Sequence, residues 1–217
     1  MSFYEQLAVE TRAEREYLLS SPIVSACLRG DVSLESYLAF LGQAFHHVRH
    51  TTPLLMSLGG RLPERLAWLR RPVAEYIEEE IGHEEWILND IAAAGGDAEA
   101  ARQSRPDLPA EVMVAYAYDL ISRGNPAGFF GMVFVLEGTS VALALTAADR
   151  IQQALELPDA AFSYLRSHGT LDQEHTKHLA LLLDKMTPED QADVVHAARV
   201  FFKLYGDIFR ALPVGGK

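Results

Sequence analysis

A long apolar segment interrupted by a single acid restricts the folds open to this chain more than any other feature. From Ala127 to Ala148 the only ionisable residue is Glu137. A segment of this length can cross a membrane or form the central helix of a helical bundle. Because the other candidate helices are amphipathic and a buried carboxylate is costly, we interpret the segment as a bundle core helix. We therefore expect no membrane span.

Helical periodicity dominates the rest of the chain, and no alternating stretch predicts a strand. The predicted helices cover about residues 3–19, 34–58, 63–94, 110–123, 126–156, a sixth opening at 158, and 188–212. Gly59 and Gly60 are expected to end the second helix, and Thr187 to cap the last one. The sequence thus predicts an all-α fold of about seven helices, in a single domain over residues 1–217.

Composition excludes several classes of function. The formal net charge of -11 argues against nucleic acid partners, which require a basic patch. The single cysteine, Cys27, rules out a disulfide framework and multi-cysteine metal sites, and it indicates a reducing compartment. Residues 2–5 form a capping-box pattern that opens an amphipathic helix rather than a signal peptide. We therefore expect a cytoplasmic protein without nucleic acid or membrane partners.

Two short motifs place a carboxylate three residues before a histidine. They occupy residues 80–83 and 172–175, and residues spaced three or four apart share one face of a helix. Mixed nitrogen and oxygen ligands suit iron or manganese better than zinc sites rich in thiolate. With a histidine one turn before the second motif and the acid of the apolar segment, the candidate metal ligands are Glu80, His83, Glu137, His168, Asp172 and His175.

Each candidate ligand has a structural alternative. Glu137 is costly inside an apolar helix unless it is paired or bound to a metal, but a protonated or arginine-paired acid would also satisfy it. The stripe formed by His168, Asp172 and His175 would look similar on an exposed polar helix face. Glu79, four residues before His83, reaches the same face as Glu80. We choose Glu80 because its spacing matches that of the second motif.

Three further histidines lie within one turn of each other. His46, His47 and His50 could support the ligands, contact a substrate or pack in the core. The sequence leaves these three roles open.

The segment Leu136-Glu137-Gly138-Thr139-Ser140 resembles the Val-Leu-Glu-Gly-Ser segment of heme-oxygenase-like proteins. Over nearly its whole length the chain resembles this superfamily, in the TenA/PqqC-like branch of iron-containing redox enzymes. Its ligand pattern is similar to that of heme-oxygenase-like diiron oxidases, which follow an acid and a histidine with a Glu and then with His-x-x-x-Asp-x-x-His. Some members place the first acid seven residues before the histidine, where this chain has Tyr76.

Other branches of the superfamily fit less well. Heme oxygenases hold heme through a histidine in the first helix, and residues 3–19 contain none. TenA thiaminases use a cysteine nucleophile on a central helix, whereas Cys27 lies near the N-terminus. The cofactorless quinone-forming branch stays open, although it would leave Glu137 without a metal.

The resemblance implies a homodimeric protein with a heme-oxygenase-like helical bundle and two iron ions, with manganese as the alternative metal. Two Fe(II) ions would be nearly neutralised by the three carboxylates of the site. Such a protein would use O2 to oxidise a small organic substrate. The alternative is a metal-free TenA-like protein with a ligand-binding, hydrolytic or regulatory role related to thiamine-pyrimidine metabolism. Metal content separates the two hypotheses.

Overall fold

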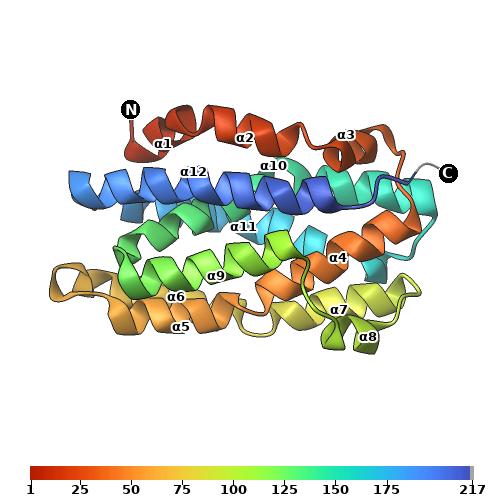
Figure 1. Ribbon diagram of the computed structural model, residues 1–217, viewed down its shortest axis with the longest axis horizontal. Helices are drawn as coiled ribbons and strands as arrows, with labels where there is room; N and C mark the ends of the chain where they lie inside the picture. Colours follow the sequence, from red (N-terminus) through yellow and green to blue (C-terminus); the bar gives the residue numbers. More distant parts are fainter. Residues whose placement is uncertain (216–217) are drawn as a thin grey trace.

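The computed structural model describes residues 1–215, except for the side chains of residues 170–174. Within this described part the chain is helical and contains no β-strand, which confirms the predicted all-α class (Figure 1). The elements, with 3-10 turns written η, are α1 (Phe3–Glu10), α2 (Arg12–Leu19), α3 (Pro22–Arg29), α4 (Leu34–Val48), α5 (Thr51–Arg61), η1 (Glu64–Leu69), α6 (Arg70–Glu80), α7 (His83–Ala93), α8 (Ala98–Gln103), α9 (Leu108–Arg123), η2 (Pro126–Gly128), α10 (Phe129–Leu155), η3 (Asp159–Ala161), α11 (Ser163–Leu183) and α12 (Pro188–Ala211).

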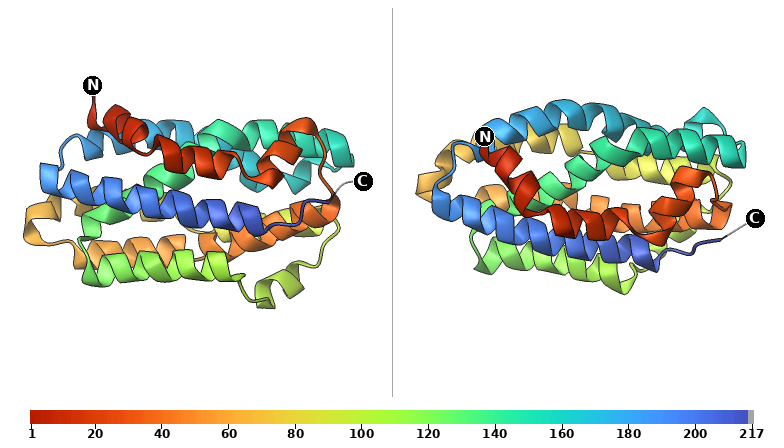
Figure 2. Two further views of the ribbon diagram at one scale, coloured as in Figure 1. Left: turned by 45° about the horizontal axis from the view of Figure 1, so that its top comes forward. Right: turned by 90° about the horizontal axis from the view of Figure 1, so that it is seen from above.

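The apolar segment forms α10, which packs against α3, α9, α11 and α12. The views in Figure 2 show α11 beside α10, while α1 to α3 follow the outer side of α12. Every residue from Phe129 to Val135 is buried. Gly131 permits close contact with α12, because a Cβ there would lie 2.7 Å from the carbonyl oxygen of Val194. Small and apolar residues thus allow α10 to pack closely inside the bundle.

One helix in the described part of the chain, Pro126–Leu155, is long and apolar enough to cross a membrane. However, 61% of its most apolar window is buried inside the bundle. Core helices of globular proteins share this property. The packing therefore accounts for its apolar composition.

Several predicted helices are divided in the structure. Thr11 separates α1 from α2, and Arg49 and His50 separate α4 from α5. The prediction that glycines 59 and 60 end a helix is wrong, since α5 continues to Arg61. Leu62 ends it with an extended ψ of 119°, as expected for a residue that precedes a proline.

The break that matters most for the site separates α6 from α7. Gly82 has a left-handed φ of 92°, a conformation that glycine adopts without steric strain. Glu80 is therefore the last residue of α6 and His83 the first of α7. The expectation that these two residues share one face of a continuous helix is wrong. A turn, rather than helical periodicity, orients them.

The start of α12 is fastened by a buried acid. Thr187 caps the helix as predicted, accepting a hydrogen bond from the backbone N–H of Asp190. The Asp190 carboxylate accepts hydrogen bonds from Arg65 at 2.6 and 2.7 Å and from Asn125 at 2.8 Å. Burial alone would raise the pKa of Asp190, but its hydrogen bonds with Arg65, Asn125 and Thr187 lower that pKa overall.

Replacing Asp190 with alanine should lower the free energy of unfolding by about 2–3 kcal/mol at pH 7, since it removes several charge-assisted hydrogen bonds. Because the folded-state pKa is lowered, this contribution is present above the unfolded pKa of about 3.9 and lost as the pH falls through the folded value. Urea unfolding at pH 7 and pH 3 measures the difference. Asp119→Ala, which breaks an exposed pair with Arg123, is the control and should change stability much less than Asp190→Ala, because solvent screens an exposed pair. Equal effects would contradict this account.

Candidate metal centre

Three side chains from α6, α7 and α11 meet inside the bundle and form a candidate metal triad. One ligand atom each from Glu80, His83 and His168 lies within 4.8 Å of the other two. Glu80 is 6% exposed and His83 is 4% exposed. Nδ1 of His83 lies 3.2 Å from Oε2 of Glu80, yet it makes no hydrogen bond to any described residue. A buried polar atom in this state calls for a further partner, and a metal ion would supply one.

The donor set and spacing of this triad fit a metal ion. Two atoms that bind one ion at roughly 2.1 Å lie no more than about 4.2 Å apart. Side-chain adjustments of under about 1 Å for each donor would bring all three to one ion. Two imidazoles and a carboxylate also match the ligands that non-heme iron uses.

Neighbouring groups orient the two histidines of the triad. Nδ1 of His168 lies 3.1 Å from the carbonyl oxygen of Tyr164, to which it donates a hydrogen bond. A neutral His168 therefore carries its lone pair on Nε2, as a metal-binding histidine requires. The ring of Trp86 stacks on His83, with 3.9 Å between ring centroids. Both imidazoles are thus held in place before any metal binds.

A second group of predicted ligands lies around His175 in α11. Its Nδ1 is 3.7 Å from Oε1 of Glu137, and its Nε2 is 3.1 Å from Oε2 of Glu79. The hydroxyl of Tyr76 donates a hydrogen bond to Oε1 of Glu137, and its ring packs edge-on against His175. We call Tyr76, Glu79, Glu137 and His175 the His175 cluster.

The structure thus divides the predicted ligands into two groups. Glu80, His83 and His168 form the triad, whereas Glu137 and His175 belong to the His175 cluster. The side chain of Asp172 lies outside the described residues. Backbone continuity of α11 places Asp172 between the two histidines along the helix.

Sequence reasoning missed two members of the His175 cluster. Helical periodicity relates Glu79 and Glu80 to His83 alone, and so offers Glu79 only as an alternative to Glu80. In the structure Glu79 instead contacts the histidine of the other motif. The position of Tyr76, seven residues before His83, was the signal that could have identified it.

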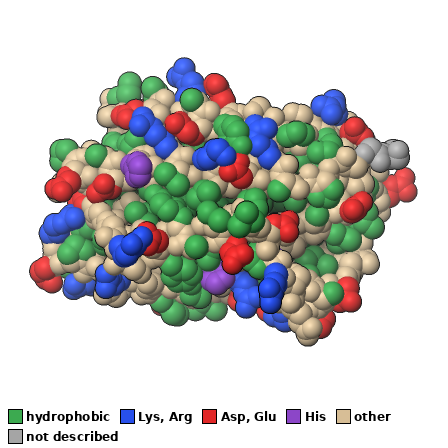
Figure 3. Space-filling model, viewed as in Figure 1, with side chains coloured by type: hydrophobic (Ala, Val, Ile, Leu, Met, Phe, Trp, Pro, Cys, Tyr) green, Lys and Arg blue, Asp and Glu red, His purple; other side chains and the backbone are tan. Residues whose placement is uncertain are grey.

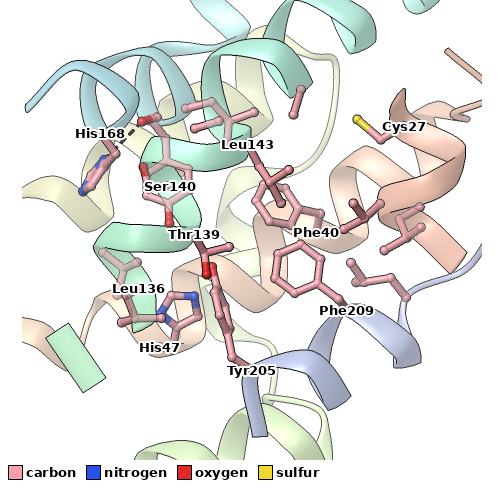
Figure 4. Close-up of a pocket in the computed structure, with 18 of the residues that line it drawn as sticks. Cys27, Phe40, His47, Leu136, Thr139, Ser140, Leu143, His168, Tyr205 and Phe209 are labelled. Atoms are coloured by element: carbon pink, nitrogen blue, oxygen red, sulfur yellow. Dashed lines mark hydrogen bonds between the residues drawn. The ribbon is translucent and has the colours of Figure 1, made fainter. Parts of the chain in front are cut away.

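A largely apolar cavity of about 150 Å³ opens from the triad toward the N-terminal helices. His168 lies at one end of it and Cys27 of α3 at the other (Figure 4), and Glu80 and Glu137 also line it. Burial raises the pKa of the Cys27 thiol to about 11. A second cavity, of about 380 Å³, is lined by the His175 cluster. Glu137, a member of the His175 cluster, lines both cavities.

The three clustered histidines have different environments. His46 pairs through Nε2 with the Ser104 hydroxyl at 2.8 Å, and His50 pairs through Nδ1 with the Tyr118 hydroxyl at 3.2 Å. His47 lines the apolar cavity and is 3% exposed. Burial lowers the pKa of His47 to about 3, which keeps its imidazole neutral at pH 7. The structure therefore separates two satisfied histidines from one that faces a cavity.

Charges on the molecular surface are mixed. On the face shown in Figure 3, acidic and basic side chains alternate with hydrophobic ones, without one continuous basic patch. This distribution accompanies the overall charge of -11.

Structural comparison places the fold among heme-oxygenase-like proteins. A domain of unknown function from Shewanella denitrificans, with a heme oxygenase-like fold, is 23% identical; the match covers 96% of this chain and 90% of that chain, with a TM-score of 0.86. A TenA homologue from Pseudomonas syringae is 13% identical, with coverages of 96% and 90% and a TM-score of 0.77. Heme oxygenase-1 from the cyanobacterium Synechocystis, in complex with heme, is 11% identical, with coverages of 98% and 92% and a TM-score of 0.75. Comparison with curated proteins gave no match.

The fold and the site together define a class: a heme-oxygenase-like helical bundle whose interior could hold a metal ion on carboxylate and imidazole ligands. Residues 38–206 match the model of the iron-containing redox enzyme family. This chain belongs to that family.

Proposed function

We propose that this protein is a non-heme diiron oxidase or oxygenase that acts on a small organic substrate with O2. The observation that carries the proposal is the convergence of Glu80, His83 and His168, of which Glu80 and His168 also line an apolar cavity. Family membership supports iron as the metal. In this proposal the cavity receives the substrate next to the metal.

The presence of two groups of candidate ligands favours a site for two metal ions. The triad would hold the first ion, and His175, Glu137 and Asp172 would hold the second. Glu137 borders both cavities and is 5% exposed, which suits a carboxylate shared between two cations. Three carboxylates beside two divalent ions leave a small net charge, which lowers the electrostatic cost of burying the two ions.

The chain's own residues prepare the site. The Tyr164 carbonyl holds the tautomer of His168, Trp86 fixes the ring of His83, and Tyr76 orients the carboxylate of Glu137. When bound, iron supplies the O2 chemistry, while the protein binds and orients the substrate. The apolar cavity walls keep bulk water away from the reacting groups.

Thiol-based hydrolysis, the alternative suggested by TenA-like relatives, is disfavoured by the position of Cys27. This cysteine lies at the end of the cavity away from His168 (Figure 4). A thiol with a pKa of about 11 is almost entirely protonated at pH 7 and is a weak nucleophile.

Anaerobic titration of metal-free protein with Fe(II) tests the proposal. We expect saturation at two ions per chain, followed by O2 consumption in proportion to bound iron. Saturation at one ion would replace the dinuclear site with a mononuclear one. Failure to bind iron at all would overturn the proposal in favour of a metal-free ligand-binding protein.

A further inference from the structure

His47 is a buried polar group that the proposed metal chemistry does not use. It lies in the last turn of α4, and its Nδ1 has no hydrogen-bond partner among the described residues. Figure 4 shows its ring beside the apolar cavity, between Leu136 and Tyr205. The Tyr205 ring packs edge-on against it at 5.6 Å. A buried imidazole nitrogen without a partner is destabilising unless a bound molecule satisfies it.

His47 is not a member of the candidate metal triad. The described cluster with donor atoms close enough to share an ion contains Glu80, His83 and His168 only. Its neighbours His46 and His50 are satisfied by hydroxyl groups of other helices. His47 is therefore a buried histidine whose side chain lines the cavity and is engaged neither by the triad nor by a hydroxyl group of another helix.

The rest of the cavity indicates the character of that molecule. None of the described residues lining it is lysine or arginine, so it offers no protein cation to an anionic head group. Thr139 and Ser140 add hydroxyl groups to the lining, while the side chains of Phe40, Leu143 and Phe209 lie between His47 and Cys27 (Figure 4). An engineered apolar cavity of about 150 Å³ in another protein holds benzene, so a volume of this size suits a small hydrocarbon group.

We infer that the substrate of this site is a neutral amphiphile, whose hydroxyl, carbonyl or amide group pairs with His47 and whose hydrocarbon end extends toward Cys27. This inference rests on the proposed oxidase function, because the bound molecule is a substrate only if the protein has that activity. The neutral imidazole offers one donor and one acceptor, which matches an uncharged polar group. His47 acts here as a positioning residue, because it holds one end of the substrate beside the metal ligands.

The polar contact can be tested with two probes of similar size, 1-octanol and 1-chlorooctane. Calorimetry should show that the parent protein binds the alcohol about 10-fold more tightly, a preference that one buried hydrogen bond can supply. His47→Leu should abolish this preference while still binding both probes, and His47→Gln should restore part of it. His46→Leu, on the same helix but outside the cavity, is the matched control and should keep the preference. An unchanged preference in His47→Leu would overturn the inference.

The hydrocarbon end can be tested separately. In the parent, affinity should rise about fourfold for each CH2 added between 1-butanol and 1-octanol, since burial of one CH2 is worth about 0.8 kcal/mol. Cys27→Phe should stop this rise at a shorter chain and leave 1-butanol binding unchanged. A parallel rise in parent and variant would show that the chain does not extend toward α3.

Both measurements are made on metal-free protein and on protein loaded anaerobically with Fe(II). Octanoate should bind metal-free protein more weakly than 1-octanol, because two acids and no protein cation line the described cavity. Tighter octanoate binding would contradict a neutral head group. If the alcohols bind as expected but iron does not bind, the proposed function is wrong and the ligand class stands. If iron binds but the alcohols do not bind as expected, the ligand class is wrong and the proposed function stands.

Discussion

Replacing His83 with alanine should lower the affinity for the first Fe(II) ion by at least about 100-fold, because loss of a supporting group alone can weaken a metal site by 10- to 100-fold and His83 would be a direct ligand. Trp86 fluorescence can report the binding of this ion. Trp86 stacks on His83, so Fe(II) in the triad should quench its fluorescence. Trp68 is the only other tryptophan and is 37% exposed, and Trp68→Phe leaves a single reporter.

Glu85→Ala is the matched control for this experiment. Glu85 lies two residues after His83 but is exposed and paired with Arg102. We expect iron affinity and Trp86 quenching to stay at the parent level in this variant. Parent-like quenching in His83→Ala would show that the triad is not the iron site, provided that circular dichroism confirms the helical fold.

Glu137→Gln should reduce iron loading from two ions per chain to one or none. The substitution keeps the size of the side chain but removes the negative charge of an acid that lines both cavities. It also relieves the metal-free protein of a buried carboxylate. We therefore expect metal-free Glu137→Gln to be at least as stable as the parent, while the stabilisation produced by Fe(II) becomes smaller. Elemental analysis and thermal unfolding with and without Fe(II) measure the two effects.

Tyr76→Phe tests whether the Tyr76 hydroxyl supports Glu137 as a metal ligand. It removes the hydroxyl that donates to Glu137 but keeps the aromatic ring beside His175. Two ions should still bind, with affinity weakened by no more than about 10- to 100-fold. If Glu137→Gln retains two ions and loses stability instead, Glu137 is a structural core acid.

The composition of the site follows from short motifs that the sequence displays directly. Glu80, His83 and His168 were identified from their residue types and spacing, and the structure brings them together. A turn at Gly82 brings Glu80 and His83 together, and not the shared helix face that their spacing predicts. Periodicity describes neighbours along one helix and carries no information about a residue on another. Glu79 and Tyr76 therefore could not be assigned to His175 before the helices were packed.

The sequence by itself determined the helical class and the burial of one acid. An apolar segment of this length must be hidden from water, and Glu137 within it must be compensated. Only the tertiary structure decided which histidine of the cluster at residues 46–50 faces a cavity. These histidines lie within one turn, and their environments differ because Ser104 and Tyr118, from distant parts of the chain, reach His46 and His50, whereas the His47 ring lines the cavity and its Nδ1 has no hydrogen-bond partner among the described residues. Partners supplied by other helices depend on how the bundle packs, and local sequence does not encode that packing.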